Sequence, residues 1–244
     1  LSLHDALPIY TFFPGLQKAV TKEKQNEANY ILIRQIQLSL IVGILLYIGY
    51  FSFGKSFIRL WMYEPQNFPL SSVGKAAQVM AILSCSKLLL LSGSFSRSIL
   101  AATGHIGFAA KMTAFEAIVN LLLSITFVLV CGWGLNGVAA GTFAAHLMFQ
   151  TILVPYYACR KAGIEWSRII FLTGVKGGIC GISFFVACHY IQKFTRSRTW
   201  LEFFFQVFLA VLIYLPMAWL ILVPVNDRYR LKNKVMTVLQ LKKN

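Results

Sequence analysis

The chain has 244 residues, of which 57% are hydrophobic and 13% are charged. Because soluble domains carry about 25% charged residues, this composition excludes an ordinary soluble domain and indicates a membrane protein. The net charge is +15, from 23 Lys and Arg against 8 Asp and Glu. The basic residues lie mostly between apolar segments, so we expect them to contact anionic membrane lipids and expect no nucleic-acid partner.

The N-terminal part of the chain predicts two features before the first apolar segment. Residues 1–9, "LSLHDALPI", resemble one reading frame of a short-read sequencing adapter, so we expect them to be an artefact. The stretch 18–35 is the most polar of the chain. We therefore expect residues 10–35 to contain the end of a truncated helix and then a cytoplasmic amphipathic linker.

Six apolar segments follow, each long enough for the roughly 20 residues of a transmembrane helix. They predict an all-α fold, a polytopic membrane bundle of six transmembrane helices followed by a basic cytoplasmic tail over 225–244. Glycines have the four-residue spacing that lets helices pack closely in lipid: Gly137 with Gly141 in the fourth segment, and in the fifth both Gly174 with Gly178 and Gly177 with Gly181. The segments cover about 36–54, 76–100, 112–131, 135–157, 169–190 and 201–224.

Basic residues are distributed unequally between the two sides of this predicted bundle. If the stretch 18–35 is cytoplasmic, fifteen Lys and Arg residues lie on its side of the membrane and six lie on the other. An excess of Lys and Arg marks the cytoplasmic side. We therefore expect both ends of the chain to be cytoplasmic.

Polar residues interrupt the apolar segments at positions four apart, which a helix brings onto one face. Glu116 and Asn120 share a face in the third segment, and Thr142, His146 and Gln150 share one in the fourth. Glu116 lies near the edge of its predicted segment, so it would face either lipid headgroups or a cavity. His146 would be either a hydrogen-bonded packing residue or a ligand.

Two lysines also lie inside the segments. Lys87 is close to mid-depth in 76–100, where a charge costs about 2.5–3.5 kcal/mol. We expect it to face a cavity, with pairing to Glu116 or snorkelling as the alternatives. Lys176 lies nearer the end of 169–190, where its ammonium could reach the headgroups.

The sequence contains no pattern typical of catalysis or metal binding. It has no Ser/His/Asp arrangement, no HExxH and no CxxC pair. We therefore expect neither an enzyme nor a cofactor or metal site. The five cysteines lie mostly in or beside apolar segments, as small buried hydrophobic residues do.

Two stretches resemble a known transporter family: "SRSILAATGHIGFAAKMTAFEAIVNLLLSI" at 96–125 and "GLNGVAAGTFAAHLM" at 134–148. They are similar to the C-terminal half of polysaccharide exporters of the O-antigen and teichoic acid type, within the MATE-like multidrug/oligosaccharidyl-lipid/polysaccharide exporter superfamily. The matching features are the turn "LAATGH", Asn120 in the next helix and the loop "GLNGVAAGT" that enters another helix. The resemblance covers residues 10 to about 190.

The resemblance implies a two-lobed fold with a central cavity, of which this chain would be the C-terminal lobe. It implies a flippase of the bacterial inner membrane that moves an undecaprenyl-pyrophosphate-linked oligosaccharide to the outer leaflet, with H⁺ or Na⁺ as a candidate coupling ion. Cationic cavity residues would contact the pyrophosphate. The candidate cavity residues are Lys87, Arg97, Glu116, Asn120, His146 and Lys176.

Two other functions stay open at this point. A MATE-type cation-coupled exporter of drugs or metabolites would need an acidic cavity, and the six segments contain only Glu116 and Glu202 as acids. A membrane polysaccharide polymerase would need a long extracytoplasmic loop, and the longest such loop expected here has about 20 residues.

Overall fold

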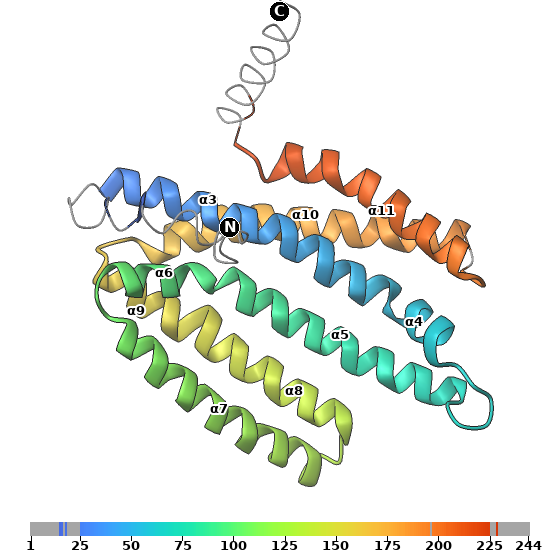
Figure 1. Ribbon diagram of the computed structural model, residues 1–244. Helices are drawn as coiled ribbons and strands as arrows, with labels where there is room; N and C mark the ends of the chain where they lie inside the picture. The colour runs from blue at the N-terminus through green and yellow to red at the C-terminus, as the bar shows by residue number, and fades with distance from the viewer. Residues whose placement is uncertain (1–14, 17, 19–24, 196, 225–227, 229–244) are drawn as a thin grey trace, which may run out of the picture.

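The computed structural model describes residues 15–16, 18, 25–195, 197–224 and 228, and the fold over these residues is all-α, as predicted (Figure 1). Residues 1–9, and the tail 225–244 apart from Arg228, lie outside the described residues. The helices are α3 (Gln25–Gly43), η2 (Ile44–Ile48), α4 (Gly49–Met62), α5 (Leu70–Ser92), α6 (Ser94–Ala102), α7 (Ile106–Leu129), α8 (Leu135–His146), η3 (Leu147–Leu153), α9 (Val154–Lys161), α10 (Trp166–Phe194) and α11 (Trp200–Ile221).

These elements join into six helices in the described part of the chain that are long and apolar enough to cross a membrane. The chain is therefore a multi-pass membrane protein, and the predicted number of spans is confirmed. The spans are Asn26–Met62, Leu70–Ala102, Ile106–Leu129, Leu135–Lys161, Thr173–Phe194 and Trp200–Ile221.

The first span begins earlier than the sequence predicts. Helix α3 starts at Gln25 and runs without a break into η2, so residues 25–35 form the beginning of the first long helix rather than a separate linker. No glycine or proline interrupts 25–42. Ala28, Leu32 and Ile36 recur every four residues and are buried in a cluster with Ile99. Packing of this stripe therefore extends the helix.

The third span also begins earlier, at Ile106 instead of 112. The turn before it contains Gly104, whose φ of +76° lies in the left-handed region that favours glycine. The earlier start places Glu116 ten residues into the helix. The expectation that Glu116 lies near the edge of its span is therefore wrong.

The spans are arranged side by side in a fixed order (Figure 1). Helix α7 packs along α8, α8 packs along α5, and α5 packs against the continuous helix formed by α3, η2 and α4. Helix α10 packs on that continuous helix and on α11. One buried cluster joins α3, α6 and α9, and a second joins η2, α4, α10 and α11.

Glycines permit two close helix contacts. A Cβ added at Gly137 would lie 3.0 Å from the Phe127 carbonyl carbon, and one added at Gly141 would lie 2.5 Å from Ser124 Oγ. Both glycines thus lie where α8 approaches α7 most closely.

In α10 only one of the two predicted glycine pairs forms the contact. Gly174 and Gly178 are exposed, and a Cβ at Gly178 would meet nothing within 4 Å. The glycines that face the neighbouring helix are Gly177, with an added Cβ 3.2 Å from Leu40, and Gly181, with one 3.1 Å from Ile48. Of the two predicted pairs, Gly177 and Gly181 therefore lie on the packing face of α10.

Candidate polar site at mid-depth

Glu116 is the centre of a polar network inside the bundle. Its side chain lies on α7 and the residue is only 7% exposed. Gln150 Nε2 donates a hydrogen bond to Glu116 Oε2. Arg97 Nη2 donates to Gln150 Oε1 over 3.0 Å. The amide of Gln150 thus connects the Arg97 guanidinium to the buried carboxylate.

His146 approaches the same carboxylate from α8. Its Nε2 lies 3.5 Å from Glu116 Oε1, and its Nδ1 is hydrogen-bonded to Ser86 Oγ. Ser86 is itself fully buried on α5. Three spans of the chain contribute to this network: Ser86 and Arg97 come from the second span, Glu116 from the third, and His146 and Gln150 from the fourth.

The polar faces predicted on α7 and α8 meet each other where these two helices pack together. Glu116 meets His146 and Gln150, and one turn further Thr142 Oγ1 donates to Asn120 Oδ1 over 3.2 Å. Short polar side chains reach across because Gly141 lets the two backbones approach. In lipid each such group needs an internal partner, and this contact supplies one to Glu116 Oε2 and to Asn120 Oδ1.

The position of Gln150 is set by an irregular segment of helix. It lies in η3, a π-helical segment between α8 and α9, a form that is rare and frequently found at functional sites. Gly93, between α5 and α6, lies against the Gln150 backbone carbonyl with no room for a side chain. This contact holds the second span against η3 and sets the amide of Gln150 between Arg97 and Glu116.

Lys87 lies beside this network on α5 and is exposed. It is the next residue after Ser86, which is hydrogen-bonded to His146. Within the described part of the chain Lys87 forms no direct ion pair with Glu116, so the pairing left open by the sequence is not what the structure contains.

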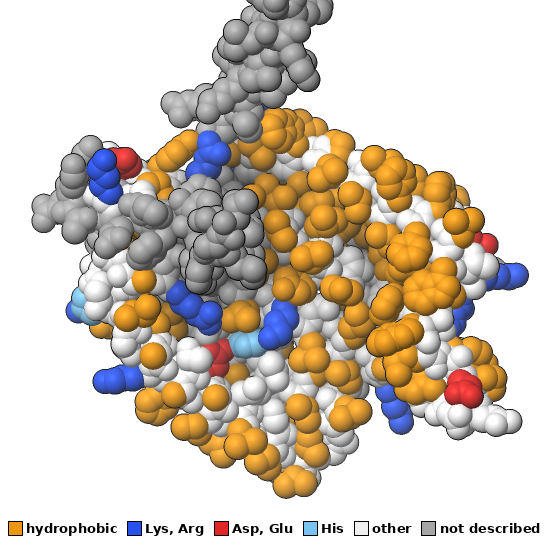
Figure 2. Space-filling view, viewed as in Figure 1, with side chains coloured by type: hydrophobic (Ala, Val, Ile, Leu, Met, Phe, Trp, Pro, Cys, Tyr) orange, Lys and Arg blue, Asp and Glu red, His pale blue; other side chains and the backbone are white. Residues whose placement is uncertain are grey.

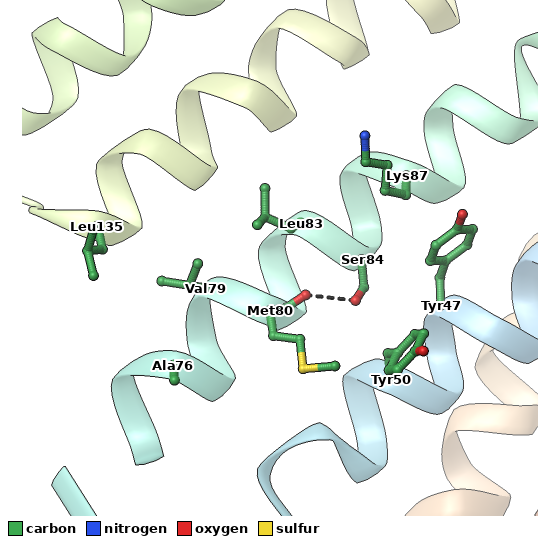
Figure 3. Close-up of a pocket in the computed structure, with 9 residues that line it drawn as sticks. All are labelled: Tyr47, Tyr50, Ala76, Val79, Met80, Leu83, Ser84, Lys87 and Leu135. Carbon is green, nitrogen blue, oxygen red and sulfur yellow. Dashed lines mark hydrogen bonds between the residues drawn. The ribbon is translucent and has the colours of Figure 1, made fainter. Parts of the chain in front are cut away.

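A shallow pocket of about 490 Å³ opens next to Lys87. Figure 3 shows Lys87 and Ser84 on α5, with Tyr47 and Tyr50 facing α5 from the neighbouring helix. The Ser84 hydroxyl donates to the Met80 carbonyl over 2.7 Å, which satisfies it locally. The ammonium of Lys87 therefore stands at the border between a pocket with two aromatic rings and the network around Glu116.

Charged side chains lie close together on the face of the molecule that Figure 2 shows. Figure 2 shows basic, acidic and histidine side chains together near the middle of that face, with hydrophobic side chains around them. Lys87 lies near the middle of the span Leu70–Ala102, and Glu116 near the middle of Ile106–Leu129. Ionisable residues at such depth are costly and usually mark a substrate or ion pathway. Two cations against one carboxylate leave the site with an excess of positive charge.

The six residues predicted to line a cavity separate into two groups. Lys87, Arg97, Glu116 and His146 belong to the site, and Asn120 lies one turn away on the same helix contact. Lys176 does not join them. It is exposed on α10, which packs on α3, α4 and α11.

Two members of the network were not among the predicted site residues. Gln150 does share a helical face with Thr142 and His146, so its position was readable from spacing. Ser86 carries no such signal, because only the crossing of α5 and α8 brings it to His146.

The described residues contain no group of three or more His, Cys, Asp or Glu side chains that could hold a metal ion. No protein-family model, curated protein or solved structure matches the chain. The function is therefore argued from the site itself.

Proposed function

We propose that the chain forms part of a flippase that moves an undecaprenyl-pyrophosphate-linked oligosaccharide from the cytoplasmic to the outer leaflet of the bacterial inner membrane. The observation that carries this proposal is the position of Lys87 and Arg97. Both are exposed on the second span, where Arg97 reaches the buried carboxylate of Glu116 through Gln150 and Lys87 directly follows Ser86, the hydrogen-bond partner of His146. A diphosphate headgroup would supply the negative charge that this face lacks.

The chemistry of the two cations fits a diphosphate. An arginine guanidinium has five N–H donors and a lysine ammonium has three. The Arg97 guanidinium is recorded with one partner, Gln150, so donors remain for a ligand. Arg suits planar or forked phosphate recognition and Lys serves as a point charge. The tyrosines of the adjacent pocket offer aromatic faces to the sugar or lipid portion of such a substrate.

A second candidate is a MATE-type cation-coupled exporter, and the burial of Glu116 favours it. A buried carboxylate can bind a cationic substrate or a coupling ion. Here, however, Gln150 and His146 already surround that carboxylate, and two exposed cations would repel a cationic substrate. The anionic substrate is therefore the better match to the charge of the site.

The proposal includes the topology expected from the distribution of basic residues. Both ends of the chain would be cytoplasmic, and the basic residues at the cytoplasmic helix ends would contact anionic lipids. Single-cysteine labelling in intact cells tests this arrangement at Arg160 and Gln66. Labelling of a cysteine at 160 from the outside would overturn it.

Complementation of a flippase-null bacterial strain tests the proposed substrate class. We expect Lys87→Ala and Arg97→Ala each to abolish surface polysaccharide at normal membrane abundance, while Lys87→Arg retains part of the activity because the charge remains. Lys176→Ala is the matched control, since it removes a lysine from a spanning helix outside the site. Full activity of Lys87→Ala and Arg97→Ala would refute the proposal. Export of a cationic dye that depends on Glu116 would favour the second candidate.

A further inference from the structure

Buried polar side chains face each other where the first span meets the second, away from the site around Glu116. Gln35 on α3 is 1% exposed, and its Nε2 donates a hydrogen bond to Ser98 Oγ on α6 over 3.0 Å. One helical turn further along α3 lies Ser39. One helical turn before Ser98 on α6 lies Ser94. We call these four residues the polar seam.

The register of the two spans places Ser39 opposite Ser94. The chain reverses direction between α4 and α5, so the first and second spans run antiparallel, and one turn forward on α3 lies opposite one turn back on α6 (Figure 1). The next turn agrees with this register, because a Cβ added at Gly43 would lie 3.0 Å from Leu91 Cδ2 on α5. Ser39 is 4% exposed and lies on the face of α3 that buries Leu32 in the cluster shared with α6.

Three buried atoms of the polar seam have no hydrogen-bond partner among the described residues: Gln35 Oε1, Ser39 Oγ and Ser94 Oγ. The amide oxygen can only accept a hydrogen bond, whereas each hydroxyl can donate one and also accept. Neither a lipid tail nor an apolar side chain can satisfy such groups inside a membrane. The polar seam therefore favours a small ligand that both donates and accepts hydrogen bonds.

Rotation of the two hydroxyls does not remove this requirement. A buried hydroxyl can bond to the backbone of its own helix, as that of Ser84 does to the Met80 carbonyl over 2.7 Å. If Ser39 and Ser94 did the same, Gln35 Oε1 would still lack a donor. The amide oxygen thus points to a ligand whatever the orientation of the serines.

Water is the ligand that fits the polar seam, because it donates and accepts and typically makes about three hydrogen bonds when buried. A cation fits less well, since the three atoms belong to neutral groups and Arg97 on the same helix as Ser94 is positive. We propose that α3 and α6 bind an ordered water molecule between Gln35, Ser39 and Ser94. This inference does not depend on the proposed function. The bound water would join the first span to the second beside the direct bond from Gln35 to Ser98.

Water-edited solid-state NMR on the serine-labelled 244-residue chain in lipid bilayers tests the inference. The method measures the polarisation that passes from water to nearby side chains, and the variants S39A and S94A assign the two serine signals by their loss. Ser96 is the control, because it is fully buried on α6 but lies two residues from Ser94 and therefore on another side of the helix. We expect transfer to Ser39 and Ser94 to be several-fold faster than transfer to Ser96.

A shared water also predicts that the two serines are energetically coupled. Each single substitution removes one partner of the water, so the second substitution costs less once the first has weakened its binding. We therefore expect the loss of Tm in S39A/S94A to be smaller than the sum of the losses in S39A and S94A. Transfer to Ser39 and Ser94 no faster than to Ser96 would overturn the bound water, even if the serines were coupled by a direct hydrogen bond. Additive losses of Tm would overturn the sharing of one water by both serines.

Discussion

Gly93 joins α5 to α6 where the second span passes closest to η3. Its φ of −80° and ψ of −5° are accessible to any residue, so the backbone does not demand glycine. Space does. A Cβ at this position would lie 3.2 Å from the Gln150 carbonyl carbon and under 3.0 Å from its oxygen, which real Cβ atoms essentially never show. Because the obstacle is helix backbone, Gly93→Ala must separate the second span from η3.

We expect a separation of about 1 Å and a loss of about 1–3 kcal/mol of stability, the usual cost of overpacking a core. A loss of 1 kcal/mol lowers Tm by about 2–4 °C in a domain of 150–250 residues, so Tm should fall by roughly 2–12 °C. The displaced Gln150 would also lose its hydrogen bonds to Glu116 and Arg97. Anion binding should therefore weaken together with stability.

Thermal unfolding can be followed with a dye that reacts with thiols. Cys159, Cys180 and Cys188 are buried and would react only on unfolding, provided that the exposed Cys85 and Cys131 are first replaced by serine. Gly178→Ala is the control, because its Cβ would meet nothing within 4 Å. An unchanged Tm for Gly93→Ala would refute the close contact between Gly93 and η3, and with it the explanation for the position of Gln150.

Three further substitutions test helix packing and helix capping in the bundle. Gly141→Ala would place a Cβ 2.5 Å from Ser124 Oγ and 2.7 Å from the Ser124 backbone nitrogen. The thiol-dye assay should therefore show a loss of about 1–3 kcal/mol of stability. A Tm equal to that of wild type would mean that α7 and α8 lie further apart. Thr199→Ala removes the N-terminal cap of α11, and at a cost of about 1 kcal/mol it should speed hydrogen exchange in the first turn of that helix without affecting its centre. Tyr214→Phe leaves the Ile41 carbonyl, which accepts from Tyr214 Oη over 2.6 Å, without this donor, and should cost about 1–3 kcal/mol; no change in Tm would show that another group satisfies this carbonyl.

The number of spans follows from composition, because long apolar helices are what a bilayer requires. The boundaries do not follow as directly. Helix α7 begins at Ile106 because of the turn at Gly104, and this shift of six residues moves Glu116 from the expected edge to the interior. A hydropathy pattern alone cannot locate such a turn, because Ala109 and Ala110 before the predicted start are compatible with either a loop or a helix.

The candidate site was likewise predictable from the sequence only in part. Spacing alone put Glu116 with Asn120, and His146 with Gln150, because these pairs lie four residues apart. Spacing could not show that the two faces meet, since this depends on the register of α7 against α8 near Gly141. The π-helix η3 was also unpredictable, because one extra residue per turn leaves no mark in the composition. Lys176 resembled Lys87 in sequence, yet the placement of α10 keeps it out of the site.

The neutral residue between Arg97 and Glu116 has a consequence for ligand binding. A direct ion pair would have cancelled the two charges within the protein, and breaking it for a ligand would expose a buried carboxylate at high cost. Gln150 instead donates to Glu116 Oε2 and accepts from the guanidinium, so this carboxylate oxygen has a neutral partner in the interior while the charge of Arg97 stays exposed. Lys87 adds a second exposed charge without its own bond to Glu116. The arrangement thus keeps the charges of Arg97 and Lys87 exposed and the carboxylate of Glu116 buried, so the anion of the proposed function would bind the exposed charges without breaking the hydrogen bond between Gln150 and Glu116.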